Sequence, residues 1–268
     1  MNPDQWLKKW LPSPFLRISL LIQVLVWPVY GFVLRDYAAL PILLVSHHVL
    51  VFLLCLNPRT SLMGINRCRI DQVQGEPPSL LLTFDDGPDP QSTPEVLAIL
   101  DHFQVKAIFF CIAQRAQAYP DLVREILARG HQIGNHSLRH ETTFAFKGPQ
   151  SLGLDLIESQ RILETLSSRQ VLWFRPPFGI RNPWMTGVLQ QHNLRLMSWT
   201  RRGYDGVISD IQKIQNNILK EIRPGDIILM HDGRSMKEGP VAHLLLPDLL
   251  TSLKDRGFTI HDPALIKT

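Results

Sequence analysis

Short apolar segments alternate with amphipathic helical patterns from Ser79 onward, and this alternation is the feature that most constrains the fold. Seven segments have the length and composition of buried strands, at residues 80–84, 107–112, 132–135, 171–174, 195–199, 226–230 and 258–260. Helical patterns lie between them, at residues 93–103, 120–129, 152–166, 208–222 and 241–256. Strands joined by crossover helices pair in parallel, so the sequence predicts an α/β fold with a parallel sheet, either open or closed into a barrel.

Two long uncharged runs precede that region. Residues 18–34 and 37–56 carry no charge, and each approaches the roughly 20 residues that cross a bilayer as a helix. A cleaved signal peptide or two buried core helices are the alternatives, but no small-residue cleavage site follows the first run. We therefore predict a hairpin of two transmembrane helices within residues 1–57, a linker rich in glycine and proline over 58–78, and a folded domain over 79–268.

Basic residues concentrate in the same amino-terminal part. Residues 1–70 carry seven Lys and Arg against two Asp, an excess of +5, whereas the whole chain carries +4. A nucleic-acid-binding domain would need the basic patch on its folded part, so we expect a lipid bilayer and no nucleic acid as partner. Positive charges flank both outer ends of the hairpin, which by the positive-inside rule places the folded domain in the cytoplasm.

Polar residues follow the predicted strands. Functional groups of parallel α/β folds gather where the strands end, so residues at those positions are expected to share one site. The residues that follow the predicted strands in this way are Asp85, Asp86, His136, His140, Arg175, Trp199, Asp205, His231 and Asp232.

His136 and His140 are four residues apart, so on one helical turn both imidazoles can chelate the same ion. A carboxylate from Asp85 or Asp86 would complete a set that holds catalytic zinc or, equally, non-haem iron. Ligand types alone therefore leave a hydrolase and an iron oxygenase open.

The second aspartate favours the hydrolase. A carboxylate beside the metal can act as general base, since a divalent ion lowers the pKa of water towards roughly 7. Arg175 can keep that carboxylate ionised, and His231 can protonate a leaving amine. Each residue also has a purely structural interpretation: Asp85 can form a turn, Arg175 an ion pair, and His231 an ordinary strand-end hydrogen bond.

The motifs and their order resemble the polysaccharide deacetylase family, carbohydrate esterase family 4, over residues 79 to about 260. Thr83-Phe-Asp-Asp-Gly-Pro88 resembles the first family motif, which implies Asp85 as general base and Asp86 as metal ligand. His136-Ser-Leu-Arg-His140 resembles the second, which implies His136 and His140 as further ligands. The resemblance also implies a distorted (β/α) barrel with about seven strands and one divalent ion, Zn²⁺ or Co²⁺.

Two further segments extend the resemblance. Arg175-Pro-Pro-Phe-Gly179 implies that Arg175 orients the base. Its remaining residues Pro177, Phe178 and Gly179 are expected to line the substrate groove. Leu229-Met-His231 implies Leu229 at the acyl pocket and His231 as general acid, tuned by Asp205.

One segment departs from the family pattern. Gly206 follows Asp205 where the family commonly has tryptophan, and Arg202 stands where the family often has an acidic residue. A shallower groove near Arg181, Arg201 and Arg202 would suit an anionic or phosphate-bearing ligand.

The sequence therefore predicts a metal-dependent hydrolase that removes an N-acyl group, N-acetyl first, from an amino sugar of a glycan or peptidoglycan. Alternatives are deformylation or deacetylation of a polyprenyl-phosphate-linked sugar, and hydrolysis of an O-acetyl ester. A catalytically silent carbohydrate-binding membrane protein is the alternative from another class. The expected location is a bacterial inner membrane, with a multi-pass anchor.

Overall fold

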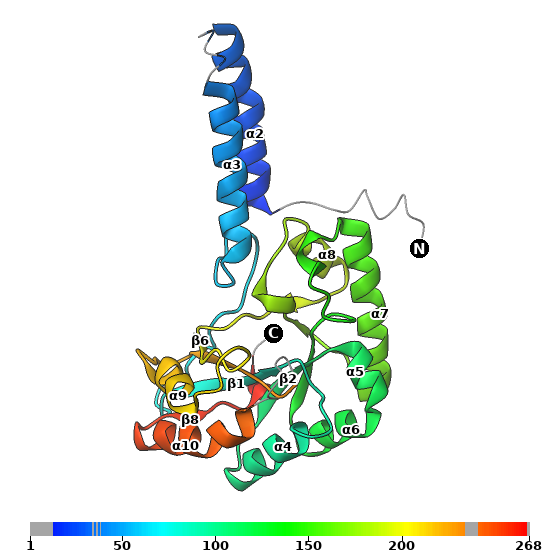
Figure 1. Cartoon of the computed structure of the whole chain (residues 1–268), viewed down its shortest axis with the longest axis vertical. Helices are drawn as coiled ribbons and strands as arrows, with labels where there is room; N and C mark the ends of the chain where they lie inside the picture. Colours follow the sequence, from blue (N-terminus) through cyan, green and yellow to red (C-terminus); the bar gives the residue numbers. More distant parts are fainter. Residues whose placement is uncertain (1–12, 34, 36, 38, 234–240, 267–268) are drawn as a thin grey trace.

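The computed structural model describes residues 13–266 except 34, 36, 38 and 234–240. An apolar helical hairpin stands on one side of an α/β domain (Figure 1). Residues 1–12, which belong to the predicted anchor, lie outside the described residues.

A curled parallel sheet forms the centre of the α/β domain, with strand order β5-β4-β3-β2-β1-β7-β6 and with β8 paired to β1. The strands are β1 (Ser79–Asp85), β2 (Ala107–Cys111), β3 (Gln132–Asn135), β4 (Trp173–Phe174), β5 (Arg195–Leu196), β6 (Arg201–Arg202), β7 (Ile227–His231) and β8 (Thr259–Ile260). All the paired strands run parallel. The predicted α/β class and parallel sheet are confirmed, and the sheet curls into an incomplete barrel.

Helices cover the outside of this sheet (Figure 1). They are α4 (Thr93–His102), α5 (Ala113–Ala118), α6 (Pro120–Ala128), α7 (Pro149–Ser167), α8 (Met185–Gln191), α9 (Ile211–Leu219) and α10 (Ala242–Asp255). Proline at the first turn of α4, α6 and α7 suits positions where no backbone N–H is needed. Helices α5 and α8 were not predicted, because six or seven residues are too few to display a helical period.

Side chains of the central strands alternate between two cores. Leu80, Leu82 and Phe84 of β1 pack beneath the helices, whereas Leu81 packs inside the barrel. Strand β7 alternates in the same way, with Ile228 and Met230 under the helices and Leu229 inside. Because strand side chains alternate with period two, Asp85 and His231 project into the barrel at the carboxyl ends of β1 and β7.

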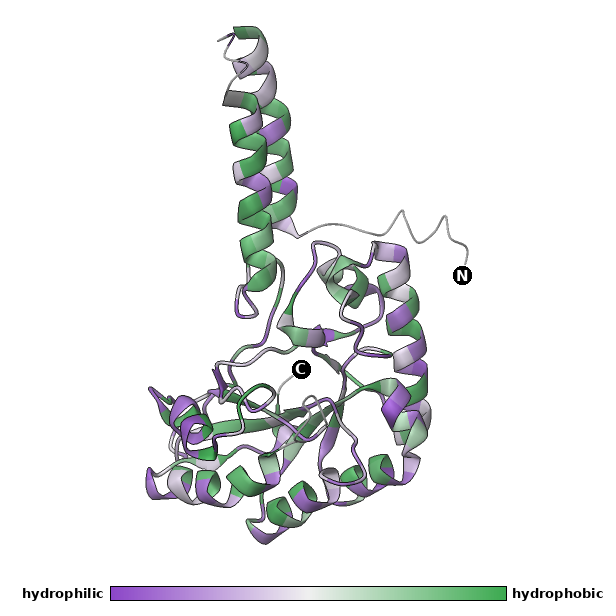
Figure 2. Ribbon diagram, viewed as in Figure 1, coloured by the Kyte–Doolittle hydropathy of each residue, from purple (hydrophilic) through white to green (hydrophobic). Residues whose placement is uncertain are grey.

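The hairpin consists of α2 (Pro14–Pro28), which continues into the π-helical turn η1 (Val29–Val33), and α3 (Ala39–Leu56). Most of its residues are hydrophobic (Figure 2), and many of its large apolar side chains are exposed. Pro14–Val33 is long and apolar enough to cross a membrane, and only 11% of its most apolar window is buried. The apolar helix Leu40–Leu56 is shorter than that. The structure thus supports one candidate span, and the predicted two-helix, multi-pass anchor is not supported.

The predicted linker over 58–78 is bonded to the barrel along part of its length. Residues 67–70, here called the strap, join the end of β5 to the start of β7. Arg67 bridges to Met197 and Arg69 to Asp226. The buried Ile70 donates its N–H to the carbonyl of Gly225 at 2.9 Å. The strap therefore belongs to the fold of the α/β domain.

Candidate active site

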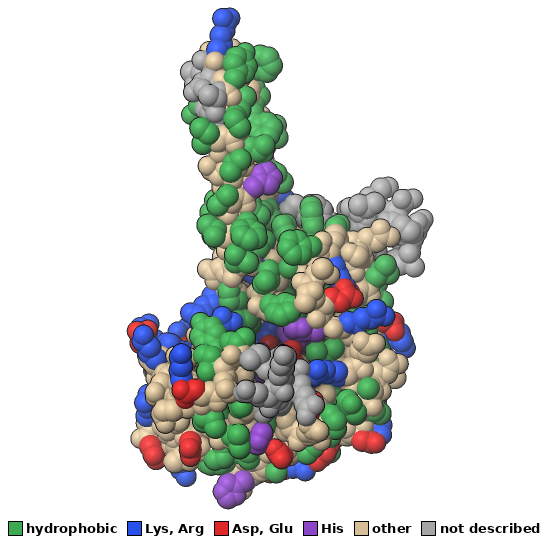
Figure 3. Space-filling model, viewed as in Figure 1, with side chains coloured by type: hydrophobic (Ala, Val, Ile, Leu, Met, Phe, Trp, Pro, Cys, Tyr) green, Lys and Arg blue, Asp and Glu red, His purple; other side chains and the backbone are tan. Residues whose placement is uncertain are grey.

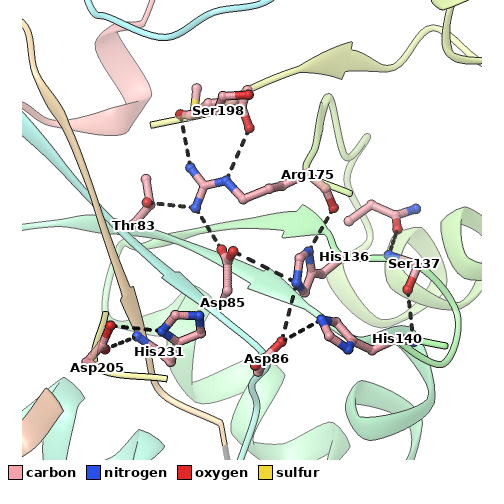
Figure 4. Close-up of polar contacts among 12 residues, drawn as sticks. Thr83, Asp85, Asp86, His136, Ser137, His140, Arg175, Ser198, Asp205 and His231 are labelled. Atoms are coloured by element: carbon pink, nitrogen blue, oxygen red, sulfur yellow. Dashed lines mark hydrogen bonds and ion pairs between the residues drawn. The ribbon is translucent and has the colours of Figure 1, made fainter. Parts of the chain in front are cut away.

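The side chain of Arg175 lies at the centre of the site and is fully buried. Its Nη1 donates to Asp85 Oδ1 at 2.7 Å and to Thr83 Oγ1 at 2.8 Å (Figure 4). Its other nitrogens reach the carbonyl oxygens of Met197 and Ser198, 3.1 and 3.3 Å away. The buried guanidinium thus gives the Asp85 carboxylate a partner of opposite charge inside the barrel.

Asp86, His136 and His140 form a second cluster beside Asp85 (Figure 4). The Nε2 atoms of both histidines lie 3.3 Å from Asp86 Oδ1. Within the described residues, this buried oxygen has no hydrogen bond of good geometry. Burial opposes ionisation of Asp86, but the close polar contact with His136 and the charges of the nearby imidazoles outweigh it and hold the pKa of Asp86 well below its usual value.

The donor set fits a divalent metal ion. Each residue offers one ligand atom, and these atoms lie within 4.8 Å of one another. His136 Nδ1 donates to the carbonyl oxygen of Arg175 at 2.7 Å, which leaves Nε2 free to act as a ligand. Such a second hydrogen bond is usual for metal-binding histidines, because it orients the ring and selects the tautomer.

The two histidines meet without a helix, contrary to the prediction. Residues 136–140 form a loop in which Ser137 and His140 have positive φ angles of 71° and 55°. Asn135 Oδ1 and Ser137 Oγ accept N–H groups within this loop, and these bonds replace helical ones. The loop still brings the two rings to 5.0 Å between centroids.

His231 and Asp205 form a pair on the other side of the pocket. His231 Nδ1 lies 3.0 Å from Asp205 Oδ1, and the backbone N–H of His231 donates to Oδ2 at 2.7 Å. Burial lowers the pKa of His231, but the charge and hydrogen bond of Asp205, with Asp86 and Asp85 beyond, outweigh it and raise the pKa to about 9. His231 is therefore protonated, and able to donate a proton, at neutral pH.

A cavity of about 330 Å³ lies between these groups and is lined by Asp85, Asp86 and the three histidines. Histidine and acidic side chains are visible in a hollow on the hairpin side of the domain (Figure 3). Phe178, Gly179 and Leu229, expected to bind substrate, also line this cavity. Pro177, expected beside them, is buried and is not among the residues that line it.

A left-handed backbone conformation positions Phe178 and Gly179. Both have positive φ angles, 59° and 70°. A Cβ atom at Gly179 would lie 2.2 Å from the ring of Trp199, so only glycine fits there. This turn holds the ring of Phe178 against that of His140 at the mouth of the cavity, with 4.6 Å between the ring centroids.

Several residues of the pocket were not predicted as substrate-binding. Tyr204 and Val207 line the cavity, on or just after the segment that departs from the family pattern. A neighbouring cavity of about 620 Å³ shares Asp86, His140 and Phe178 and is lined also by Arg115 and Arg139. The position of Arg115 just after β2 is a sequence signal that could have identified it.

Two of the three arginines expected near the groove lie elsewhere. Arg181 is buried and donates to the carbonyl of Met63 at 2.8 Å, below the hairpin. Arg201 pairs with Asp226 at 2.9 Å. Only Arg202 of the three lines the cavity.

Comparisons with known proteins agree with this geometry. A family model described as polysaccharide deacetylase matches residues 72–197. A peptidoglycan-N-acetylglucosamine deacetylase of Bacillus cereus is 34% identical over 181 residues, covering 67% of this chain and 83% of the relative. A chitooligosaccharide deacetylase of Sinorhizobium fredii is 34% identical over 194 residues, covering 68% of this chain and 89% of the relative.

A solved structure of a family 4 carbohydrate esterase from Streptomyces lividans, in complex with acetate, superposes with a TM-score of 0.62 at 25% identity. The match covers 68% of this chain and 91% of that one. Similarity in sequence, in fold and in the order of the motifs thus leads to one assignment: the chain belongs to the polysaccharide deacetylase family.

Proposed function

We propose that this protein is a metal-dependent N-deacetylase that acts on an acetylated amino sugar of a glycan such as peptidoglycan or a chitooligosaccharide. The relatives named above support this substrate class. The observation that carries the proposal is the arrangement of one pocket: the cluster of Asp86 and two histidines lies between an arginine-bound carboxylate and a protonated histidine. An iron oxygenase would need neither of the two flanking groups.

Asp86, His136 and His140 would hold the ion, with Zn²⁺ or Co²⁺ as the expected metal. A divalent ion bound there supplies Lewis-acid chemistry, lowering the pKa of water from about 15.7 to roughly 7 and polarising an acyl oxygen.

Two other side chains of the pocket then carry out the two proton transfers. Asp85, oriented by Arg175, accepts a proton from the attacking water. His231, kept protonated by Asp205, donates a proton to the sugar nitrogen as the carbon–nitrogen bond breaks. One carbon–oxygen bond forms and one carbon–nitrogen bond breaks, so the products are acetate and a free amine. Leu229 and Phe178 contribute apolar walls for the acyl group.

The test is release of acetate by the purified full chain from N-acetylglucosamine oligomers, before and after removal of metal with a chelator. We expect release that a chelator abolishes and that Zn²⁺ or Co²⁺ restores. Metal binding without any acetate release would contradict the proposal and favour the catalytically silent carbohydrate-binding protein. Release of acetate from O-acetylated sugar alone would favour the esterase.

We also propose that residues 1–57 anchor a catalytic domain of residues 79–268 in a bacterial inner membrane, with α3 as a second span and the domain in the cytoplasm. The exposed apolar surface of the hairpin supports an anchor. A cytoplasmic domain would favour the second candidate, deacylation of a polyprenyl-phosphate-linked amino sugar. Release of acetate or formate from lipid-linked sugar but not from oligomers would support that candidate. Protease accessibility in sealed vesicles would test on which side of the membrane the catalytic domain lies.

A further inference from the structure

Among the described residues, Arg202 is the charged group of the pocket that has no partner of opposite charge. Asp85 pairs with Arg175, Asp205 pairs with His231, and Asp86 lies against two imidazoles. Within the described part of the chain, no carboxylate lies within ion-pair distance of Arg202, and its guanidinium forms no hydrogen bond. The side chain is nevertheless partly buried in the lining of the cavity.

Aromatic rings hold this arginine in place. Its guanidinium carbon lies 4.1 Å from the centroid of Tyr204 and 5.7 Å from that of Trp199. Cation–π contacts use the face of the guanidinium and leave its N–H edge available. A planar edge of this kind suits bidentate binding of a carboxylate or phosphate.

The strand register places Arg202 beside the reacting groups. In β6 it pairs with Leu229 of β7, two residues before His231. The preceding residue, Arg201, projects to the opposite side of β6 and pairs with Asp226. The two adjacent arginines therefore have different surroundings. Of the two, Arg202 lines the pocket and has no charged partner in the part of the chain that the structure describes.

We infer that Arg202 is a specificity-determining residue that binds an anionic group of the substrate, next to the sugar whose amide is cleaved. The inference rests on the proposed deacetylase function. The shared chemistry is a carboxylate or phosphate. A carboxylate would come from an acidic sugar in a polymer, and a phosphate from a phosphate-linked sugar.

The experiment compares three substrates: a neutral N-acetylglucosamine tetramer, a disaccharide that carries the carboxylate of N-acetylmuramic acid, and N-acetylglucosamine 1-phosphate. Arg202→Gln should lower kcat/KM for one or both anionic substrates by about 10- to 100-fold, mainly through KM, as loss of a charged hydrogen bond predicts. For the neutral tetramer the loss should stay below about threefold. Which anionic substrate responds identifies the source of the anion.

Two further variants separate charge from folding. Arg202→Lys keeps the charge but loses the planar edge, so it should recover part of the preference for the anion. Arg161→Gln removes one charge from the exposed face of α7 and should change none of the three rates. Equal losses on all three substrates, or no loss on the anionic ones, would overturn the inference.

A binding measurement keeps this test separate from the test of the proposed function. Calorimetric titration with N-acetylglucosamine 1-phosphate and with the muramic acid disaccharide should give, for at least one of the two, a Kd at least tenfold weaker for Arg202→Gln than for the unaltered protein. If no substrate releases acetate, the proposed function fails and the titration still decides the role of Arg202. If acetate is released and neither Kd changes, the inference about Arg202 fails by itself.

Discussion

Arg175 explains how two adjacent aspartates tolerate burial side by side. Asp85 is 3% exposed and Asp86 is 6% exposed, and each ends in a different environment. One carboxylate binds a guanidinium, whereas the other faces two imidazoles. Opposite partners offset the desolvation of each charge, so the pair can serve as two separate functional groups.

This division predicts different effects for two substitutions. Asp85→Asn should lower kcat by about 10²- to 10⁴-fold, the usual contribution of a general base, and should leave bound metal unchanged. His136→Ala should lose both activity and metal. Metal analysis of the purified variants beside acetate release will distinguish them. Near-full activity of Asp85→Asn would show that another group is the base.

The contact between Asp205 and His231 predicts a shift in the pH profile. The general acid must be protonated, so activity is lost as pH rises through the pKa of His231, which lies at about 9. Asp205→Asn removes the largest contribution that raises this pKa, so the alkaline limb of the kcat profile should move to lower pH. The control Asp121→Asn changes an exposed carboxylate on α6 and should leave the limb in place. An unshifted limb in Asp205→Asn would contradict the assignment of His231.

At the scale of elements, the strap connects the amino-terminal region to the barrel. Ile70 is 5% exposed and packs inside the barrel with Leu81 and Met197. Arg59, further towards the hairpin, donates to the carbonyl of Thr200 at 2.8 Å. These contacts make the segment after α3 part of the cooperative unit of the α/β domain.

The strap can be tested with two isoleucines five residues apart. Ile70→Ala should lower the free energy of unfolding by about 2–5 kcal/mol, because it leaves a cavity in the core. Ile65→Ala changes a side chain that is 85% exposed, so its effect should stay within about 0.5 kcal/mol. Urea denaturation of both variants measures the difference. Equal stabilities would mean that the strap contributes nothing to the fold.

The sequence predicted those elements that have a strong apolar signal. Strand β3 was predicted with its observed bounds, and β1, β2 and β7 to within one residue at either end. Strand β6 was missed, because two consecutive arginines have no apolar pattern and it forms only by pairing with β7. The strap was missed for a similar reason, since Ile70 is its only apolar residue.

The candidate site was predictable to the extent that it depends on strand ends. The carboxyl ends of parallel strands converge, and the structure brings together Asp85, Asp86, His136, Arg175 and His231 as that rule requires. The rule does not extend to loops. The strand-end rule did not predict the conformation of residues 136–140 or a role for Tyr204. It also could not predict that Arg202 lines the pocket whereas Arg201 does not. These features depend on contacts between segments far apart in the sequence.

At the scale of the whole molecule, an exposed apolar hairpin is joined to a domain with an ordinary polar surface (Figure 3). Side chains in the middle of the candidate span face outwards, for example Val24 at 67% exposure. The anchor proposed above would cover this surface with lipid.

The full chain should therefore remain in the membrane pellet after extraction with alkaline carbonate. Val24→Arg should reduce that fraction, because an arginine in the middle of a span costs about 2.5–3.5 kcal/mol on insertion scales. The control Arg161→Gln should not change it. A soluble full-length chain would contradict the anchor, and a shortened chain that lacks residues 14–33 would instead identify a cleaved signal sequence.

The segment between α3 and β1, which includes the strap, also affects the order in which the chain folds during synthesis. Arg59 bonds to Thr200, 141 residues later, so the early segment must wait for its partners to leave the ribosome. Contacts between such distant residues form slowly, because loop-closure entropy must be overcome first. Until they form, the ends of the sheet at β5 and β6 remain open, and open sheet edges are prone to wrong pairing. The nascent chain is thus most vulnerable while the strap still lacks its partners at the end of β5 and the start of β7.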